Sequence, residues 1–533
     1  MTSVGQALVA QLVEREVDTA FGIPGVHTVE LYRGLADSGI RHITPRHEQG
    51  AGFMADGYAR VSGKPGVAFV ITGPGLANTL TAMGQARADS VPMLVVSGVN
   101  ALDSLGLGLG HLHELPDQRA MARTVALISE RVEDDADLTP ALDRAFAPFR
   151  SGRPGPTHIE IPLDVAGTDY TASPIASTQP TDHPVDPKLV AQAAEMLAGA
   201  KAPIILTGGG ARWASEAIQL LAEKLDAPVV QTVNARGIMF DHPLGVPASP
   251  SLLAVRELIE SSDVVLAVGT ELGQTDYDMY ATGTISDMPS LIRIDLCPDQ
   301  LARHTAKLPI LGEASRTIEA INELLKDIVK AENGAVRAST ARQKAQEEIG
   351  PEMRALCAIL DAARTAVPEA IMVGDSTYAI YAGNLYYDHD RPGGWFNAAT
   401  GFGALGYGIP AAIGASLADR SAPVICIAGD GGAQFSLPEI MCAVDEKLPI
   451  TFLIWNNHGY QEIATSMQAV GVSVLGCDPT PPDFEHVARS YDIPFRRVEA
   501  DPAAIADALS SAQTIDGPRL IEVRAPNQSQ NPQ

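Results

Sequence analysis

Two polar residues, Asp430 and Asn457, each follow a short apolar run, and their side chains have the chemistry of a metal site. Residues 424–428 form the first run, and residues 449–455 form the second. Carboxylate and amide oxygens suit hard Mg²⁺, and phosphate and water complete its coordination shell. The two glycines that follow Asp430 leave backbone N–H groups open to phosphate oxygens. The spacing therefore predicts a site for a metal ion bound to a diphosphate.

A strand–helix–strand unit has to position these two side chains. Both runs are short and apolar, as is typical of buried parallel strands. Between them, Ser436 to Glu439 (SLPE) predicts a capping box with proline in the first turn, and a helix follows to about Lys447. A right-handed crossover lays the two strands side by side. Asp430 and Asn457 then meet at the carboxyl ends of the strands, where open α/β sheets bind ligands.

The pair resembles the cofactor motif of thiamin-diphosphate (ThDP) enzymes, which implies that Asp430, Asn457 and the carbonyl of Gly459 bind Mg²⁺. Residues 46–60 (RHEQGAGFMADGYAR) resemble the pyrimidine-binding domain of the acetolactate synthase and 2-oxo acid decarboxylase branch of that family. In this resemblance, Glu48 hydrogen-bonds the ring nitrogen N1′ of the aminopyrimidine and promotes deprotonation of the thiazolium C2. A carboxylate in a dry pocket can hold or share a proton near neutral pH, as that role requires.

Further matches to the family extend over most of the chain. Two glycine-proline turns, at residues 21–25 and 72–75, resemble loops around the pyrimidine ring, and residues 374–377 resemble a loop beside the diphosphate. Residues 399–412 resemble the segment beneath the cofactor, where Leu405 falls at the bulky apolar position that bends the two rings toward each other. The resemblance implies these cofactor-binding residues: Pro24, Gly25, Gly73, Asn78, Ser376, Thr377, Gly403, Leu405, Gly429, Gly431, Gly432 and Ala433.

Composition and charge exclude several classes of partner. The 533 residues carry a net charge of −26, which argues against nucleic acid and anionic membranes as partners. No apolar stretch approaches the ~20 residues of a membrane span. Ser3 and Gln6 have the spacing of a capping box, so we expect a capped first helix rather than a signal peptide. The five cysteines form no C-x-x-C pair, which indicates reduced thiols in a cytoplasmic protein.

Apolar strands alternate with helical stretches throughout, which predicts the α/β class with doubly wound parallel sheets. We expect three domains: a pyrimidine-binding domain at residues 1–170, a Rossmann-like middle domain at 186–328 and a diphosphate-binding domain at 350–525. The expected linkers are a stretch rich in proline, serine and threonine at about 171–187 and a polar helical stretch at about 326–348.

Some members of this family hold FAD in the middle domain. Residues 208–210 are three glycines without the G-x-G-x-x-G spacing of a dinucleotide site. Residues 269–273 are not followed by the arginine- and aspartate-rich run of the FAD-binding relatives. FAD is therefore an alternative that the sequence leaves open but does not favour.

Three histidines are candidate proton donors to a reaction intermediate. His111 and His113 lie two residues apart in a loop where acetolactate synthases have Phe-Gln-Glu, and His27 follows a Pro-Gly turn. Imidazole is suited to proton transfer near pH 7. The choice among the three stays open, as does the alternative that they are ordinary loop histidines.

Residues 24–33 and 112–118 resemble the 5-guanidino-2-oxopentanoate decarboxylase branch. This resemblance implies ThDP- and Mg²⁺-dependent decarboxylation of a small-molecule 2-oxo acid to an aldehyde through an enamine intermediate. A buried guanidinium group needs a carboxylate partner, because burying an unpaired cation is costly. Glu114 and Glu462 are the candidates for this substrate contact.

Three other functions stay open. An acetolactate synthase-like carboligase would form acyloins from pyruvate. A non-catalytic ThDP-binding subunit would share the fold, although Glu48, Asp430 and Asn457 count against it. An oxidoreductase using flavin or nicotinamide rests on the middle domain alone. In this family the cofactor lies between domains of different subunits, so the resemblance also implies a homodimer or homotetramer.

Overall fold

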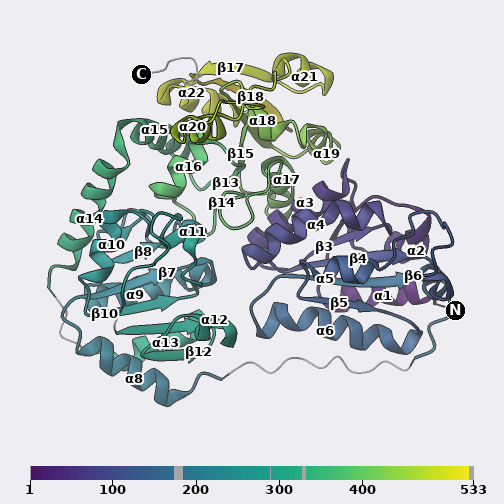
Figure 1. The fold of residues 1–533 in the computed structure, drawn as a ribbon, viewed down its shortest axis with the longest axis horizontal. Coiled ribbons are helices and arrows are strands. Elements are labelled where there is room, and N and C mark those ends of the chain that lie inside the picture. Colours follow the sequence, from purple (N-terminus) through teal and green to yellow (C-terminus); the bar gives the residue numbers. More distant parts are fainter. Residues whose placement is uncertain (1, 173–183, 289, 327–331, 527–533) are drawn as a thin grey trace.

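The computed structural model describes residues 2–172, 184–288, 290–326 and 332–526, and it contains three six-stranded sheets with flanking helices (Figure 1). All strand pairs within these sheets are parallel, so the expected α/β class with three doubly wound domains is confirmed. Most of the first predicted linker falls on residues 173–183, which lie outside the described residues. Among the described helices, none is long and apolar enough to cross a membrane.

The N-terminal sheet consists of β1 (Thr19–Gly22), β2 (Arg41–Ile43), β3 (Gly66–Val70), β4 (Met93–Val99), β5 (Ile128–Arg131) and β6 (Pro156–Pro162). Its helices are α1 (Val4–Glu14), α2 (Val29–Ala36), α3 (Glu48–Ser62), α4 (Pro74–Ala88), α5 (Gln118–Arg123), α6 (Leu138–Ser151) and α7 (Leu163–Ala166). The strand order is β2-β1-β3-β4-β6-β5, so the chain changes direction across the sheet between β1 and β3. The two glycine-proline turns follow these two strands, at the place where such sheets bind ligands.

Local sequence signals account for the start of this domain. The predicted capping box of α1 is confirmed: the hydroxyl of Ser3 accepts a hydrogen bond from the N–H of Gln6 at 3.2 Å, and Oε1 of Gln6 accepts one from the N–H of Ser3 at 3.0 Å. Strands β3 and β4 are buried along their whole length. This burial matches their largely apolar sequences, since both faces of a central parallel strand are covered by helices.

The middle sheet consists of β7 (Pro203–Thr207), β8 (Val229–Gln231), β9 (Gly245–Val246), β10 (Val264–Val268), β11 (Leu291–Asp295) and β12 (Leu308–Leu311). Its helices are α8 (Pro187–Ala198), α9 (Ser215–Leu225), α10 (Leu253–Glu260), α11 (Gln274–Tyr277), α12 (Pro298–Arg303), α13 (Ala314–Leu324) and α14 (Gly334–Glu348). The order β12-β11-β10-β7-β8-β9 is that of a Rossmann-like sheet with its switch point between β7 and β10.

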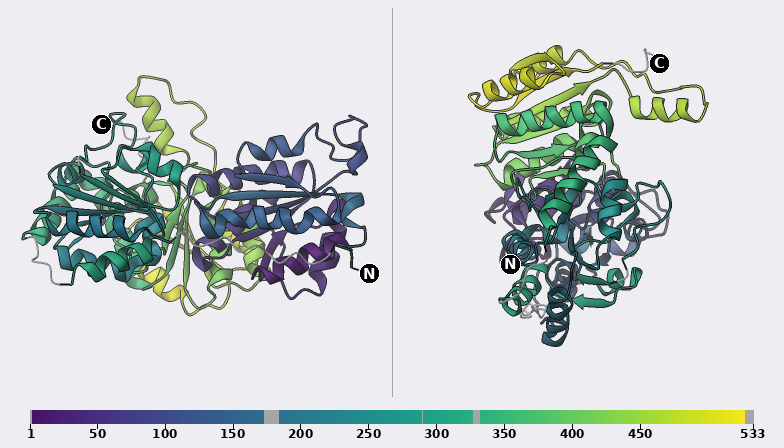
Figure 2. Two further views of the ribbon diagram at one scale, coloured as in Figure 1. Left: turned by 90° about the horizontal axis from the view of Figure 1, so that it is seen from below. Right: turned by 90° about the vertical axis from the view of Figure 1, so that its left-hand side faces the viewer.

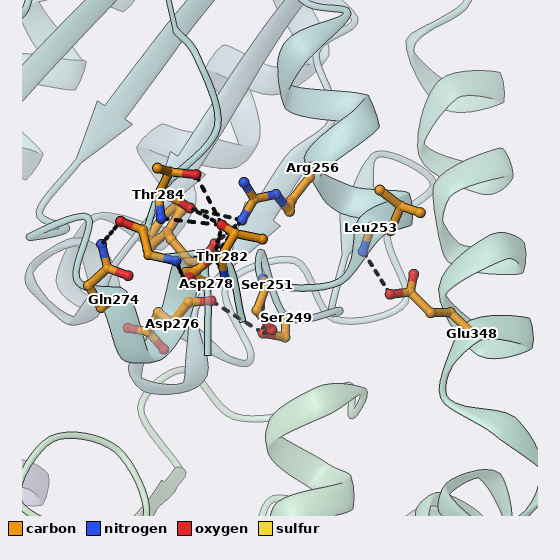
Figure 3. A network of polar contacts seen from close by, with 12 residues as sticks. Ser249, Ser251, Leu253, Arg256, Gln274, Asp276, Asp278, Thr282, Thr284 and Glu348 are labelled. Carbon is orange, nitrogen blue, oxygen red and sulfur yellow. Dashed lines mark hydrogen bonds and ion pairs between the residues drawn. The ribbon is translucent and has the colours of Figure 1, made fainter. Parts of the chain in front are cut away.

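Helix α14 occupies most of the second predicted linker and packs on the middle domain. Its last residue, Glu348, accepts hydrogen bonds from the N–H groups of Leu253 at 2.7 Å and Ala254 at 3.0 Å, and so caps the start of α10 (Figure 3). Nearby, Arg256 of α10 forms an ion pair with Asp278 at 2.9 Å (Figure 3). From residue 334 on, the stretch interpreted as a linker is thus part of the packed middle domain.

The C-terminal sheet consists of β13 (Ile371–Gly374), β14 (Trp395–Asn397), β15 (Val424–Gly429), β16 (Ile450–Asn456), β17 (Phe495–Glu499) and β18 (Arg519–Arg524). Its helices are α15 (Gly350–Ala366), α16 (Tyr378–Leu385), α17 (Gly408–Ala418), α18 (Asp430–Ala433), α19 (Ile440–Asp445), α20 (Gln461–Ala469), α21 (Phe484–Ser490) and α22 (Pro502–Ala512). Strands β15 and β16 pair in parallel, as predicted. The order β14-β13-β15-β16-β18-β17 repeats the order of the N-terminal sheet.

The turn between α18 and α19 departs from the prediction. Residues Leu437–Glu439 form a 3₁₀ turn, and α19 ends at Asp445, before the predicted end. The hydroxyl of Ser436 caps no N–H group of this turn. The carboxylate of Glu439 instead accepts hydrogen bonds from two N–H groups that precede α3 in the N-terminal domain. The predicted capping box is therefore wrong, because the carboxylate is bound by the neighbouring domain.

Helices α3 and α17 pack against each other across the boundary between the N-terminal and C-terminal domains (Figure 1). A Cβ atom at Gly57 would clash with the carbonyl group of Ala411, and one at Gly414 would clash with the carbonyl group of Met54. The two backbones therefore approach closely because glycine occupies both contact points.

A buried ion cluster joins all three domains. Arg60 of α3 donates to Asp56 at 2.6 Å, to Asp89 at 2.7 Å and to Asn234 of the middle domain at 3.3 Å. Tyr407 of the C-terminal domain donates to Asp56 at 2.6 Å. The N-terminal and middle domains lie side by side, and the C-terminal domain contacts both (Figures 1 and 2). This cluster fixes the relative placement of the three sheets.

Candidate active site

A pocket of about 390 Å³ lies in the C-terminal domain, where the loops after β13, β15 and β16 meet. It brings together the predicted metal-binding residues, most of the predicted diphosphate-side residues and one of the two predicted substrate acids. The predicted residues that line it are Ser376, Thr377, Gly403, Leu405, Gly429, Asp430, Gly431, Gly432, Asn457, Gly459 and Glu462. Ala433 does not line this pocket and is buried at the end of α18.

Asp430 and Asn457 lie next to each other, as the strand pairing requires. The N–H group of Asn457 donates to Oδ1 of Asp430 at 3.4 Å, and the Asp430 side chain is fully buried. Burial raises the pKa of Asp430, while hydrogen bonds from the N–H groups of Asn457 and Gly459 oppose this shift. A buried carboxylate beside an amide oxygen and a backbone carbonyl is a donor set that suits Mg²⁺.

Other side chains of the domain lie close to the backbone of the two glycines after β15. A Cβ atom at Gly431 would lie 2.5 Å from the ring of Tyr460, and one at Gly432 would lie 3.1 Å from Oδ1 of Asp375. Asp375 lies behind this loop and accepts hydrogen bonds from Ser376 N–H at 2.8 Å and Gly408 N–H at 3.1 Å. Burial raises the pKa of Asp375 to about 6. The residues that fit a metal-bound diphosphate are Asp430, Asn457 and the glycine loop beside them, which line the same pocket.

Glu48 is the first residue of α3, and its carboxylate accepts a hydrogen bond from the Asn78 side chain at 3.0 Å. Pro24 and Gly25 follow β1, and Gly73 follows β3, so these turns flank the switch point of the N-terminal sheet. The structure thus gathers the predicted pyrimidine-side residues at one edge of this sheet.

His27 and His113 lie close together beside these turns. Their ring centroids are 5.6 Å apart, and Nδ1 of each ring is buried without a hydrogen-bond partner among the described residues. A Cβ atom at Gly73 would lie 2.6 Å from the carbonyl oxygen of His113, so the loop that carries this histidine packs directly on the turn after β3. Burial, and secondly the charge of His113, lower the pKa of His27. The two imidazole rings are thus placed beside the pyrimidine-side turns.

His111 and Glu114 have a different placement from that of the histidine pair. The carboxylate of Glu114 accepts hydrogen bonds from the N–H groups of Leu109 at 3.2 Å, Gly110 at 2.7 Å and His111 at 3.0 Å. The side chain of His111 is exposed. Glu114 therefore closes its own loop, whereas Glu462 lines the pocket of the C-terminal domain. The structure does not bring the two predicted substrate acids together.

Gln118, which was not predicted as a site residue, ties the histidine loop to the turn after β3. Its Oε1 accepts hydrogen bonds from the Thr72 hydroxyl at 2.9 Å and from Gly73 N–H at 3.0 Å, while its Nε2 donates to Glu160 at 3.1 Å. Gln118 is the last residue of the loop at residues 112–118. Hydrogen bonds between distant side chains cannot be predicted from a sequence pattern, so its role was not foreseen. Also missed are the pocket residues Tyr378, Tyr381, Ala399, Tyr460, Gln461 and Ile463.

The two halves of the candidate site lie in different domains. Every residue that lines the pocket belongs to residues 376–463, whereas Glu48 and the histidine pair belong to the N-terminal domain. Both halves lie at the switch points of sheets with the same strand order. A pocket whose residues fit a metal-bound diphosphate in one such domain, and a carboxylate beside glycine turns in the other, are the features expected of ThDP-binding enzymes.

Comparisons with known proteins agree with this class. Residues 2–121 match the model of the thiamine pyrophosphate enzyme N-terminal TPP binding domain, residues 190–321 its central domain and residues 374–523 its C-terminal TPP binding domain. The chain therefore belongs to the thiamine pyrophosphate enzyme family.

Individual relatives cover nearly the whole chain. The probable 2-ketoarginine decarboxylase AruI of Pseudomonas aeruginosa is 41% identical over 98% of this chain and 94% of that protein. The probable acetolactate synthase large subunit of Methanococcus aeolicus is 28% identical over 97% of this chain and 91% of its own length. The acetolactate synthase isozyme 3 large subunit of Escherichia coli is 28% identical over 92% of this chain and 89% of its own length.

Proposed function

We propose that this enzyme is an Mg²⁺-dependent 2-oxo acid decarboxylase whose substrate is 5-guanidino-2-oxopentanoate, also called 2-ketoarginine. Two lines support this substrate: the activity for which the AruI relative is named, and the presence of the Glu462 carboxylate in the pocket that holds Asp430 and Asn457. The second observation carries the proposal, because the guanidinium group, at the end of the substrate away from the 2-oxo carbon, requires an acid at the far end of the pocket.

The surroundings of Glu462 suit a planar cation. Tyr378 and Tyr381 line the same pocket, with ring centroids 6.4 Å apart, and the charge of Glu462 contributes to raising the pKa of both phenols, after burial. Guanidinium groups stack on aromatic rings and form paired hydrogen bonds with carboxylates. A carboxylate next to two tyrosines can therefore select a guanidinium substrate over pyruvate.

Each half of the site has a defined task in this proposal. Asp430, Asn457 and the carbonyl of Gly459 hold the metal ion, and the glycine loop after β15 binds the diphosphate. When bound, the cofactor supplies the electron sink for loss of CO₂. Glu48 exchanges a proton with the pyrimidine nitrogen, and His113 or His27 donates a proton to the product. The apolar side chain of Leu405, which lines the same pocket, would contact the cofactor when it is bound.

The substrate proposal is tested by measuring CO₂ release from 5-guanidino-2-oxopentanoate, pyruvate and benzoylformate with ThDP and Mg²⁺ present. We expect kcat/KM to be highest for the guanidino acid. Glu462 is exposed in this structure, so Glu462→Gln is expected to lower this value by about tenfold, because a hydrogen bond to a charged group contributes ~1.5 kcal/mol. Rates with pyruvate and benzoylformate should change little.

Glu114→Gln serves as the matched comparison. Because Glu114 holds only its own loop, this variant should affect all three substrates alike. If Glu114→Gln alone removes the preference, the substrate acid has been assigned to the wrong residue. Preference for pyruvate with acetolactate as product would favour the carboligase alternative, which the acetolactate synthase relatives support.

We also propose that the active site forms between two copies of the chain, as a homodimer or a dimer of dimers. The pocket has lining residues from the C-terminal domain only. Apolar side chains are exposed beside both halves, with Leu112 63% exposed in the histidine loop and Leu475 82% exposed after α20. Exposed apolar surface of this kind marks an interaction site. In a two-fold symmetric dimer, the surface around Leu112 of one chain would pack against the surface around Leu475 of the other, and both copies of this contact would form together.

Mixing two inactive variants tests this arrangement. Glu48→Gln and Asp430→Ala chains, unfolded and refolded together in equal amounts, should regain about a quarter of the wild-type activity, because random two-fold pairing leaves one intact site in every mixed dimer. Each variant refolded alone is the control. If the mixture stays inactive although light scattering shows dimers, the site lies within one chain.

A further inference from the structure

Glu439 is a buried acid of the C-terminal domain that contacts the chain directly before Glu48. Its side chain is 2% exposed. Oε2 accepts a hydrogen bond from Arg46 N–H at 2.9 Å, and Oε1 accepts one from His47 N–H at 2.9 Å. Arg46 and Glu439 are 393 residues apart in the sequence. The last two N–H groups before α3 are thus held by a different domain.

The surrounding contacts leave this carboxylate little freedom. A Cβ atom at Gly50, in the first turn of α3, would clash with Oε1 of Glu439. Asp445 of α19 forms a further ion pair with Arg46 at 2.5 Å. Burial raises the pKa of Glu439 to about 7, while the N–H groups of Arg46 and His47 oppose this shift. The turn before Glu48 is therefore fixed by the C-terminal domain at several points.

Glu439 does not serve as the acid of a capping box at the start of its own helix, α19. The sequence places it where a capping-box acid would serve the start of α19, but Ser436 caps no N–H group there. Meanwhile His47, the N-cap of α3, accepts a hydrogen bond from Gln49 N–H at 3.1 Å and so caps α3 within its own domain. The Glu439 contact therefore holds the two domains in a fixed relative position at His47, the residue next to Glu48.

We infer that Glu439 is a positioning residue for Glu48: by holding the N–H groups of Arg46 and His47, it sets where the Glu48 carboxylate stands relative to the pyrimidine ring. This inference rests on the proposed function of Glu48. Acid–base catalysis depends steeply on geometry, so a small displacement of α3 slows proton exchange without changing the contacts that hold the diphosphate. The same domain therefore binds the diphosphate through one loop and orients a catalytic carboxylate through the next turn.

The first test compares Glu439→Ala and Glu439→Gln with Ser436→Ala. Glu439→Ala should lower kcat by about 10- to 100-fold, the effect of a misplacement near 1 Å, with KM and ThDP affinity unchanged within about threefold. Glu439→Gln should fall between wild type and Glu439→Ala, because its amide can accept only one of the two hydrogen bonds. Ser436→Ala removes a hydroxyl that caps nothing and should leave kcat unchanged.

Two further measurements separate positioning from general destabilisation. In the protein without cofactor, hydrogen exchange of the peptide containing Arg46 and His47 should be about tenfold or more faster in Glu439→Ala, since that turn loses its tie to the C-terminal domain. With cofactor bound, exchange of the thiazolium C2 proton for deuterium should slow by the same factor as kcat. A general loss of stability would accelerate exchange throughout the chain instead.

Gly50→Ala disturbs the same contact from the opposite side. Alone, it should lower kcat, because the new methyl group displaces the carboxylate of Glu439. Combined with Glu439→Ala, it should add less than about a twofold loss, since the group it displaces is gone. Fully multiplicative effects in this double-mutant cycle would contradict the inference.

The outcome separates this inference from the proposed function. If Glu48→Gln loses its activity but Glu439→Ala and Glu439→Gln keep wild-type kcat, the positioning role is refuted while the proposed function stands. If Glu48→Gln keeps its activity, the proposed function fails first. Should Glu439→Ala not fold, Glu439→Gln and Gly50→Ala decide the question with the same measurements.

Discussion

Replacing Glu48 with glutamine is expected to lower kcat by about 10²- to 10⁴-fold, the range that a positioned acid–base group contributes. The glutamine side chain has the same shape and can still accept the hydrogen bond from Asn78, so the fold should be retained. ThDP affinity should stay close to wild type, because the diphosphate is held in the other domain. CO₂ release and calorimetric titration of ThDP measure the two quantities separately.

Glu30→Gln is the matched control for this prediction. Glu30 is an acid of the same domain that forms an ion pair with Arg33 at 2.8 Å. Surface pairs of this kind contribute little to stability, so its loss should leave both turnover and cofactor binding unchanged. Near-normal turnover of Glu48→Gln would show that Glu48 does not act on the pyrimidine.

Asp430→Ala is expected to weaken ThDP binding by about 100-fold or more in the presence of Mg²⁺. The variant removes the charged ligand of a divalent ion that neutralises an anionic diphosphate, and such charged contacts contribute several kcal/mol when buried. Wild-type protein titrated with ThDP in EDTA should show a loss of similar size. Calorimetry with and without Mg²⁺ provides both measurements.

Asp507→Ala is the control for the metal prediction. Asp507 lies in the same domain on α22, where it is 69% exposed and pairs with Arg496. Its replacement should leave ThDP affinity unchanged. Equal ThDP affinity for Asp430→Ala and wild type would place the metal site elsewhere.

The placement of Asp430 beside Asn457, the proposed metal site, follows from local sequence patterns. Residues 424–428 and 449–455 are apolar runs of strand length, and the crossover rule alone places the ends of two such strands together. The structure confirms this pairing: Gly429 pairs with Trp455, and the N–H group of Asn457 lies 3.4 Å from Oδ1 of Asp430. Fold class and strand pairing depend on short-range periodicity and connection geometry, so they can be predicted from the sequence.

Contacts that depend on the packing of domains cannot be predicted from local sequence patterns. The SLPE motif is an ordinary helix start by local rules, and only the approach of the N-terminal domain diverts Glu439 to Arg46 and His47. The three N–H groups that hold Glu114 converge because Gly108 and Gly110 adopt positive φ angles of 66° and 75°. Glycine permits positive φ angles, but a glycine in the sequence does not predict that its φ angle is positive.

The close glycine contact between α3 and α17 also sets an order of events during biosynthesis. Asp56 precedes its partner Tyr407 by 351 residues, and Phe53 of α3 packs edge-on against the same tyrosine. At roughly 5–20 residues per second, the ribosome needs on the order of half a minute to synthesise that interval. Nascent chains therefore carry an uncovered apolar face on α3 for that time, and a fragment that ends before α17 never covers it.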